Sequence, residues 1–252
     1  MKSNGYIKTK LSILLCFMYF LFNSCSEPSP ASKITDISDL KAEIDIYQKL
    51  TDDNDNSISI VLHDRNDKIF GNDSVNIWVN GQKAEYRIVQ GLYYIKNYLY
   101  HTEKVSPENN KYEFQIQLAN GKKFFMASIP SLKESSSRNI IYKEEAPLTS
   151  DFTIQWSSLY DVNVLYLSKS VKIITKEESN VKTYAEQTGD TIKIGPSGSY
   201  TLKKEKFSKP GETLSILSFE FTAEKSGTVN PQLLKGSTIN INGNHDEQVH
   251  FK

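Results

Sequence analysis

The chain has 252 residues, with 30 basic and 30 acidic side chains and a formal net charge of +0. Proteins that bind nucleic acid use a surplus of Lys and Arg for phosphate contacts, so this charge balance argues against a nucleic-acid partner. The length suits two domains of ordinary size.

The N-terminus has the pattern of a secretory signal. Its first ten residues carry Lys2, Lys8 and Lys10 and no acid, and residues 11–22 are apolar apart from Ser12. A basic segment followed by a short apolar run is typical of a signal peptide. Because spanning a bilayer takes roughly 20 apolar residues, we expect a cleaved signal over residues 1–24 and no transmembrane helix. Its removal leaves 27 basic and 30 acidic residues, a net charge of −3.

Cys25 follows this signal, in the order Leu21-Phe22-Asn23-Ser24-Cys25. A small residue directly before a cysteine resembles the lipobox of bacterial lipoproteins, in a loose form typical of Bacteroidota. The resemblance implies that a diacylglyceryl group is attached to Cys25, so the membrane is an expected partner. We therefore expect an envelope protein anchored in the outer membrane, on its surface or periplasmic side. The alternative is an ordinary cleaved signal with an incidental cysteine.

The residues after Cys25 read as a flexible tether over residues 25–38, because they are rich in Ser and Pro. From residue 39 onward, apolar and polar residues alternate with the period of a β-strand. Two such runs flank Asn80-Gly81 and two flank Asn120-Gly121, and Asn-Gly between alternating strands is a strong signal for a hairpin. These features predict an antiparallel β-sandwich over residues 39–130.

The pattern stops at residues 131–138, which we interpret as a linker, and short strands resume over residues 139–252. A short helix is expected near residues 176–184. Phe152-Thr153-Ile154-Gln155-Trp156 and Gly198-Ser199-Tyr200-Thr201-Leu202 resemble strands of fibronectin type III and other immunoglobulin-like modules. The predicted fold class is therefore all-β, with two tandem immunoglobulin-like sandwiches. The whole mature chain resembles two-domain lipoproteins of Bacteroidota.

A tyrosine-rich segment, Leu92-Tyr93-Tyr94-Ile95-Lys96-Asn97-Tyr98-Leu99-Tyr100, is the candidate binding site. If it is a strand, four of its side chains share one face. An exposed row of this kind offers aromatic rings on which a sugar stacks. The alternative is structural, because tyrosine is a good strand former. The candidate glycan-binding residues are Tyr94, Lys96, Tyr98 and Tyr100.

Other motifs are weaker. Asp53, Asp55 and Ser57 have the alternate spacing of a calcium loop, but Ile58 stands where an EF-hand needs glycine, so a solvated loop is the preferred interpretation. The histidines lack zinc-ligand spacing, and no nucleophile motif is present, so we expect no metal, no cofactor and no catalytic residue. Ser74 and Thr191 each follow Asp and precede an apolar residue, a pattern of O-glycosylation in Bacteroidota.

These observations predict a non-enzymatic, lipid-anchored envelope protein that serves in binding, adhesion or scaffolding. The alternative is an accessory glycan-binding lipoprotein of a polysaccharide-uptake system. A glycan or another envelope protein is the expected partner.

Overall fold

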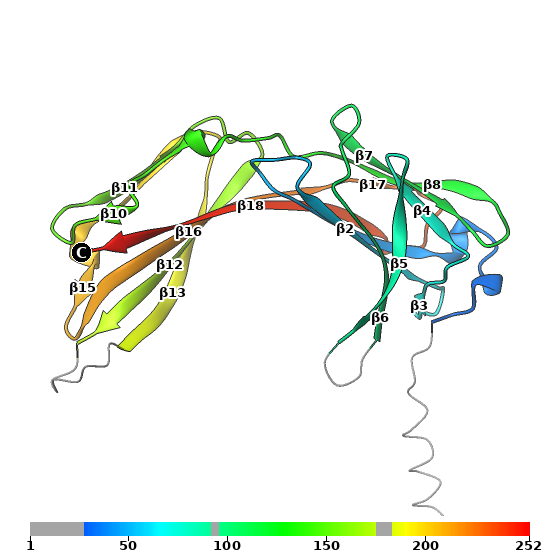
Figure 1. The fold of residues 1–252 in the computed structure, drawn as a ribbon, viewed down its shortest axis with the longest axis horizontal. Helices are drawn as coiled ribbons and strands as arrows, with labels where there is room; N and C mark the ends of the chain where they lie inside the picture. The colour runs from blue at the N-terminus through cyan, green and yellow to red at the C-terminus, as the bar shows by residue number, and fades with distance from the viewer. Residues whose placement is uncertain (1–27, 92–95, 175–182) are drawn as a thin grey trace, which may run out of the picture.

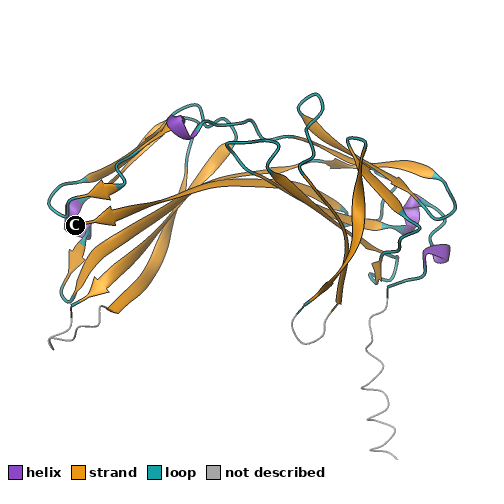
Figure 2. Cartoon of the chain, in the orientation of Figure 1, coloured by secondary structure: helices purple, strands orange, loops and turns teal. Residues whose placement is uncertain are grey.

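The computed structural model describes residues 28–91, 96–174 and 183–252, and these are almost entirely β-strand (Figures 1 and 2). The prediction of an all-β chain is confirmed. None of the described segments forms a helix long and apolar enough to cross a membrane. The strands are β1 (Lys41–Gln48), β2 (Asn56–His63), β3 (Ile69–Phe70), β4 (Asn76–Val79), β5 (Gln82–Gln90), β6 (Lys96–Glu103), β7 (Lys111–Gln117), β8 (Lys123–Pro130), β9 (Ile140–Ile141), β10 (Glu145–Ala146), β11 (Phe152–Trp156), β12 (Val162–Ile173), β13 (Thr183–Lys193), β14 (Gly198–Leu202), β15 (Ser208–Lys209), β16 (Glu212–Ser226), β17 (Thr228–Val229) and β18 (Thr238–Phe251).

The first half packs two layers of strands against each other. β1, β2, β6 and part of β5 form one layer, and β4, β7, β8 and β17 form the other. β5 belongs to both, because its first residues pair with β4 and the rest with β6. Each layer turns one apolar face inward, as Ile44 and Ile46 show by alternating with the outward Asp45 and Tyr47.

The second half has a large and a small sheet. β13, β12, β16 and the end of β18 form the large one, and β14, β11 and β9 cover one of its faces. Aromatic rings join the two: the Trp156 ring meets that of Phe221 at 5.6 Å between centroids, and Phe152 meets Phe251 at the same distance. No described strand packs on the other face of the large sheet, which faces the inside of the arch in Figure 1.

β18 joins the two halves into one sheet. Its first residues pair in parallel with β1, and its later residues pair antiparallel with β16 (Figure 1). β17 also returns to the first half, where it pairs with β8. The expectation of two independent tandem sandwiches is therefore not confirmed, because residues from the C-terminal half complete the N-terminal one. The sheet is mixed, which differs from the purely antiparallel arrangement expected.

The segment interpreted as a linker, residues 131–138, is fixed against the fold. The buried Gln48 side chain donates a hydrogen bond to the Leu132 carbonyl oxygen at 2.9 Å and accepts one from the Leu132 amide at 3.1 Å. Ser135 donates its amide to the Leu50 carbonyl oxygen at 2.7 Å. Gly243 of β18 lies against the same residues, since a Cβ there would lie 2.5 Å from the Gln48 carbonyl oxygen. We call Gln48, Leu50, Leu132 and Gly243 the elbow.

The described part of the expected tether, residues 28–38, also packs on the first half. Ala31, Ile34 and Ile37 are buried, and the Ser29 amide bonds the Ile69 carbonyl oxygen at 2.9 Å. Apolar side chains at every third position make this segment part of the core, although its Ser and Pro content is typical of a flexible tether. Residues 25–27 lie outside the described residues.

The Asn80-Gly81 hairpin is confirmed. Val79 pairs with Gln82, and both turn residues have positive φ, 46° and 78°. At Asn120-Gly121 the chain also reverses, but only Gly121 has positive φ, and the turn begins at Leu118. Of the helix expected near residues 176–184, most lies outside the described residues, and β13 begins at Thr183.

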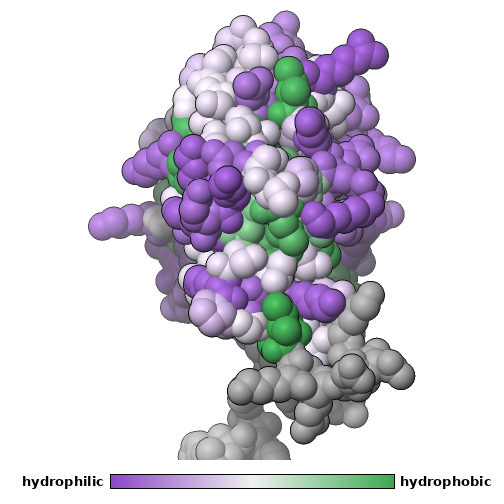
Figure 3. Space-filling model, turned by 90° about the vertical axis from the view of Figure 1, so that its left-hand side faces the viewer, coloured by the Kyte–Doolittle hydropathy of each residue, from purple (hydrophilic) through white to green (hydrophobic). Residues whose placement is uncertain are grey.

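Figure 3 looks onto the end of the second half. Hydrophilic side chains cover most of this view, and apolar side chains form small, separate patches. Among the described residues visible there, no broad apolar surface is present for docking another protein.

Candidate functional site

Polar side chains from four strands meet on the uncovered face of the large sheet. Tyr166 of β12 lies opposite Thr191 of β13 on one side and Glu220 of β16 on the other, and Glu220 lies opposite Asp246 of β18. Residues paired across antiparallel strands point to the same face. The row therefore presents a hydroxyl, a phenol ring and two carboxylates next to one another.

These residues border a cavity of about 440 Å³, which is within the roughly 300–1,000 Å³ range of small-molecule sites. A second row, Ser168, Ser218 and Gln248, completes it. We call it the Tyr166 cavity. Tyr166 is 43% exposed, which leaves a large part of its ring open to solvent.

The polar groups of the Tyr166 cavity are largely free. Within the described part of the chain, no intramolecular hydrogen bond engages the side chains of Ser168, Thr191, Ser218, Asp246 or Gln248. Glu220 accepts one bond at 2.7 Å from the Asn244 amide, whose oxygen accepts another at 2.6 Å from the Tyr47 hydroxyl. This chain of bonds holds the Glu220 carboxylate in place, and the second carboxylate oxygen, Oε2, has no hydrogen-bond partner among the described residues.

The electrostatics of the Tyr166 cavity are acidic. Its lining includes no Lys, Arg or His, and the carboxylates of Glu220 and Asp246 share the face of Tyr166. Asp190 and Glu247 also border it, but they pair with the buried Leu167 and Phe219, so their side chains point to the covered face. Two of these charges have basic neighbours, because Lys169 lies 3.5 Å from Asp190 and His245 lies 3.2 Å from Glu247. Burial raises the pKa of Tyr47, and the nearby carboxylates, including Asp246 and Glu220, add to the rise.

The tyrosine-rich strand faces the core. Tyr98 and Tyr100 of β6 are 8% and 1% exposed. The Tyr100 hydroxyl donates to the Asn72 backbone carbonyl oxygen at 2.9 Å and accepts from the Asn72 backbone N–H at 3.0 Å. Burial raises the pKa of Tyr100. The expectation of an exposed platform is wrong for these two rings. Tyr98 and Tyr100 do lie on the same face of the strand, but that face is buried. Lys96 is exposed, and Tyr94 lies outside the described residues.

The other predicted residues are scattered. Cys25 lies outside the described residues. Ser74 is exposed in the turn before β4, and Thr191 is exposed in β13, where it borders the Tyr166 cavity. The two hydroxyls belong to different halves of the molecule.

No metal centre is found among the described residues, where no group of three His, Cys, Asp or Glu side chains could hold an ion. In the expected calcium loop, Asp55 lies 3.6 Å from the Lys49 ammonium, and the Asp53 carbonyl oxygen accepts from the Asn56 amide at 2.7 Å. These contacts fit a hydrogen-bonded turn.

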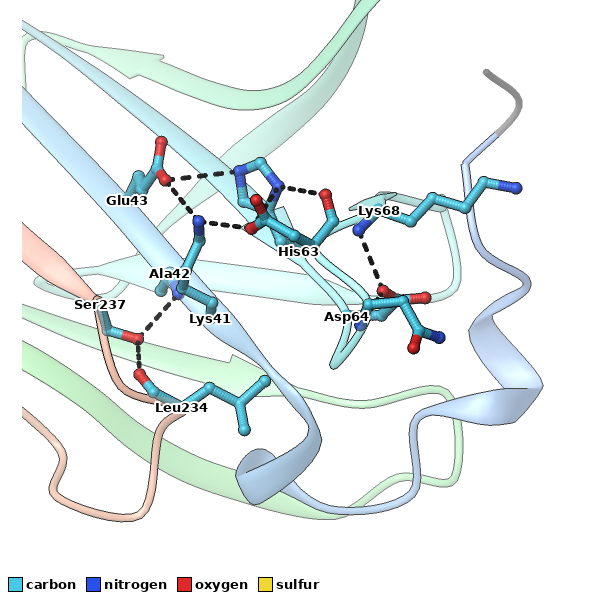
Figure 4. Close-up of polar contacts among 10 residues, drawn as sticks. Lys41, Ala42, Glu43, His63, Asp64, Lys68, Leu234 and Ser237 are labelled. Carbon is cyan, nitrogen blue, oxygen red and sulfur yellow. Dashed lines mark hydrogen bonds and ion pairs between the residues drawn. The ribbon is translucent and has the colours of Figure 1, made fainter. Parts of the chain in front are cut away.

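Two histidine clusters were not foreseen. At one corner of the first half, the Lys41 ammonium bonds Asp67 at 2.6 Å and Glu43 at 3.0 Å, and His63 lies 3.6 Å from Glu43 (Figure 4). The hydrogen bond from Lys41 lowers the pKa of the Asp67 carboxyl. The cluster ties the β2–β3 turn to β1, a structural role for all four side chains.

The second cluster has the order of a catalytic triad. The Ser59 hydroxyl lies 3.5 Å from His101 Nδ1, and His101 Nε2 lies 2.8 Å from Glu103 Oε1. However, Ser59 is in the middle of the sheet, paired with Asp45 on one side and His101 on the other. Those pairings occupy the backbone amides that an oxyanion hole would need. The arrangement therefore lacks the geometry for acyl transfer.

Sequence reasoning missed Tyr166, Glu220 and Asp246. The available signal was the alternation of each strand, which marks these positions as outward. It could not show that the three strands are neighbours, because that pairing joins distant parts of the chain.

Comparison with known proteins gives little more. No protein-family model matches the chain, and no curated protein matches it. Among solved structures it is similar to SGBP-B of the Bacteroides ovatus mixed-linkage glucan utilization locus, solved with a mixed-linkage heptasaccharide, at 12% identity and a TM-score of 0.23. The match covers 90% of this chain and 46% of SGBP-B, so the chain spans less than half of that protein. A TM-score this low establishes neither a shared fold nor a shared ligand.

Proposed function

We propose that this protein is a non-catalytic binding protein of the cell envelope, held there by a lipid on Cys25, and that it binds a neutral glycan in the Tyr166 cavity. The observation that carries the proposal is the composition of that cavity: one open phenol ring surrounded by hydroxyl, amide and carboxylate groups, most of which have no hydrogen-bond partner among the described residues. The expected glycan-binding role is kept, but it moves from the tyrosine-rich strand to the opposite half of the molecule.

The chemistry of a sugar matches this surface. A pyranose ring has a face of C–H groups that packs on an aromatic ring, and Tyr166 offers such a ring. Its hydroxyls are both donors and acceptors. Glu220 and Asp246 accept hydrogen bonds from them, and bonds to charged groups are stronger than those between neutral groups. Ser168, Ser218 and Gln248 supply both donors and acceptors.

The negative charge of the cavity lining determines which class of sugar can bind there. The lining carries carboxylates and no basic side chain, so a uronate or sulfate group would meet like charge inside a partly desolvated cavity. We therefore expect the Tyr166 cavity to bind uncharged hexose oligosaccharides and to reject uronate-containing ones of the same length.

The test is calorimetric titration of the protein with neutral and uronate-containing oligosaccharides, together with Tyr166→Ala. Loss of the ring should weaken neutral-glycan binding at least about tenfold, since tenfold corresponds to about 1.4 kcal/mol. Tyr160→Ala is the matched control, because Tyr160 is 62% exposed and does not line the cavity. Absence of neutral-glycan binding, or equal affinity in Tyr166→Ala and the parent protein, would refute the proposal.

Adhesion or scaffolding through a protein partner is the second candidate, favoured by the open edge of the large sheet. Among the described residues, β13 pairs with β12 on one side and is the last strand of the sheet. An edge strand can accept an extended segment of another protein. If this is the role, proline at alternate positions within residues 183–187, the part of β13 that does not line the Tyr166 cavity, should abolish partner capture and leave glycan binding unchanged.

A further inference from the structure

A tryptophan is turned outward on the first half of the molecule. In β4, Ile77 and Val79 are buried in the core, and Trp78 between them points to the other side of the sheet. Its neighbours across the strands are Lys83 of β5 and Gln115 of β7. The core does not require a large ring at this outward position, so the sequence places one where a ligand can reach it.

A cavity of about 460 Å³ lies over this part of the sheet, again in the roughly 300–1,000 Å³ range of small-molecule sites. We call it the Trp78 cavity. The residues that matter for its chemistry are Trp78, Asn80, Asn109, Glu113, Gln115 and Lys123.

One wall of the Trp78 cavity is fixed before any ligand arrives. The Asn80 amide donates to the carbonyl oxygens of Ser106 and Lys111, both at 3.0 Å, and its oxygen accepts from the Glu113 amide at 2.8 Å. The Lys111 ammonium bonds the Glu113 carboxylate, also at 2.8 Å. Groups held in this way lose little freedom on binding, which favours affinity.

Other groups are free to bind. Within the described residues, the side-chain amides of Asn109 and Gln115 make no intramolecular hydrogen bond. The Lys123 ammonium lies over the Trp78 ring, 5.4 Å from its centroid, so a sugar ring that stacks on this face displaces the lysine side chain. The cavity thus combines an aromatic face with amide donors and acceptors, and the charge of Glu113 is neutralised by Lys111.

We infer that the Trp78 cavity is a second carbohydrate-binding site, which takes one hexose ring stacked on Trp78 with its hydroxyls bonded to Gln115 and Asn109. Unlike the Tyr166 cavity, it contains lysines, so it accepts both neutral and uronate-bearing rings. The two cavities share no residue and lie in different halves of the molecule, near β4 and near β12 in Figure 1. The inference therefore does not depend on the function proposed for the Tyr166 cavity.

Tryptophan fluorescence tests this inference directly, because the chain contains two tryptophans. Trp156 is buried, and its Nε1–H donates to the Gly195 carbonyl oxygen at 3.0 Å, so a ligand should not alter its emission. The full chain in mild detergent is titrated with tetrasaccharides of glucose, galactose, mannose and galacturonate. We expect at least one of them to shift the emission of the parent protein and none to shift that of Trp78→Phe.

Three further variants separate the alternatives. Tyr166→Ala should keep the shift, which shows that the signal does not come from the other cavity. Gln115→Ala should weaken binding about tenfold, the upper effect of losing one hydrogen bond. Gln117→Ala, two residues along the same strand and outside the cavity, should leave it unchanged. No shift with any tetrasaccharide, an equal shift in Trp78→Phe, or loss of the shift in Tyr166→Ala would overturn the inference.

Discussion

Replacing Gly243 with alanine tests whether the elbow holds the two halves together. The new Cβ would lie 2.5 Å from the Gln48 carbonyl oxygen, 2.6 Å from Leu132 Cδ1 and 3.0 Å from Leu50 Cδ2. The first contact is with backbone, which cannot rotate away, and the Gln48 side chain is itself fixed by its two bonds to Leu132. Overpacking a core costs about 1–3 kcal/mol, and three contacts this short place Gly243→Ala in the upper part of that range, about 2–3 kcal/mol.

Urea unfolding followed by far-ultraviolet circular dichroism measures this loss. Gly195→Ala is the matched control, because a Cβ at Gly195 meets no atom within 4 Å and the residue does not have a positive φ. At such a site the substitution should be neutral or stabilise the protein by up to about 1 kcal/mol, because alanine lowers the conformational entropy of the unfolded chain. A loss below about 0.5 kcal/mol in Gly243→Ala, the usual effect of a surface substitution, would refute the close packing of the elbow.

The remaining predictions concern the elbow and the ion cluster. Gln48→Leu should destabilise the protein by about 2–6 kcal/mol, because the Leu132 amide and carbonyl lose their buried partner at roughly 1–3 kcal/mol each. The exposed Gln90→Leu should have little effect in the same urea titration. The pKa of Asp67 is lowered from 3.8 by Lys41, so its contribution to stability is present above about pH 4 and disappears as the pH falls through the lowered value. Asp67→Asn should therefore lower the urea midpoint at pH 7, and its effect should shrink as the pH falls below about 4. A difference of the same size at every pH between 7 and 2 would contradict this linkage.

Local patterns in the sequence predicted much of the secondary structure. Alternation placed Ile44 and Ile46 inside, and Asn80-Gly81 specified its hairpin because both positions need positive φ. Phe125 shows where a local rule fails. Its alternation with Ala127 and Ile129 predicts a buried side chain, but an irregularity in the β7–β8 pairing shifts the register, and Phe125 is 40% exposed.

Long-range pairing could not be predicted from the same patterns. β18 has the alternation of any half-buried strand, and nothing in its residues says that one end pairs with β1 and the other with β16. For the same reason the tyrosine strand was assigned the correct parity but the wrong face. Alternation shows only that Tyr98 and Tyr100 share one face of β6. Which of the two faces is buried depends on the layer of strands that packs against β6.

The central claim is that the Tyr166 cavity binds a neutral glycan, and a crystal structure of the protein with the tightest-binding neutral tetrasaccharide tests it most directly. The account predicts one sugar ring against the Tyr166 phenol, with hydroxyls in hydrogen-bond contact with Glu220 and Asp246. Saccharide bound elsewhere on the molecule, with the Tyr166 cavity empty, would contradict it.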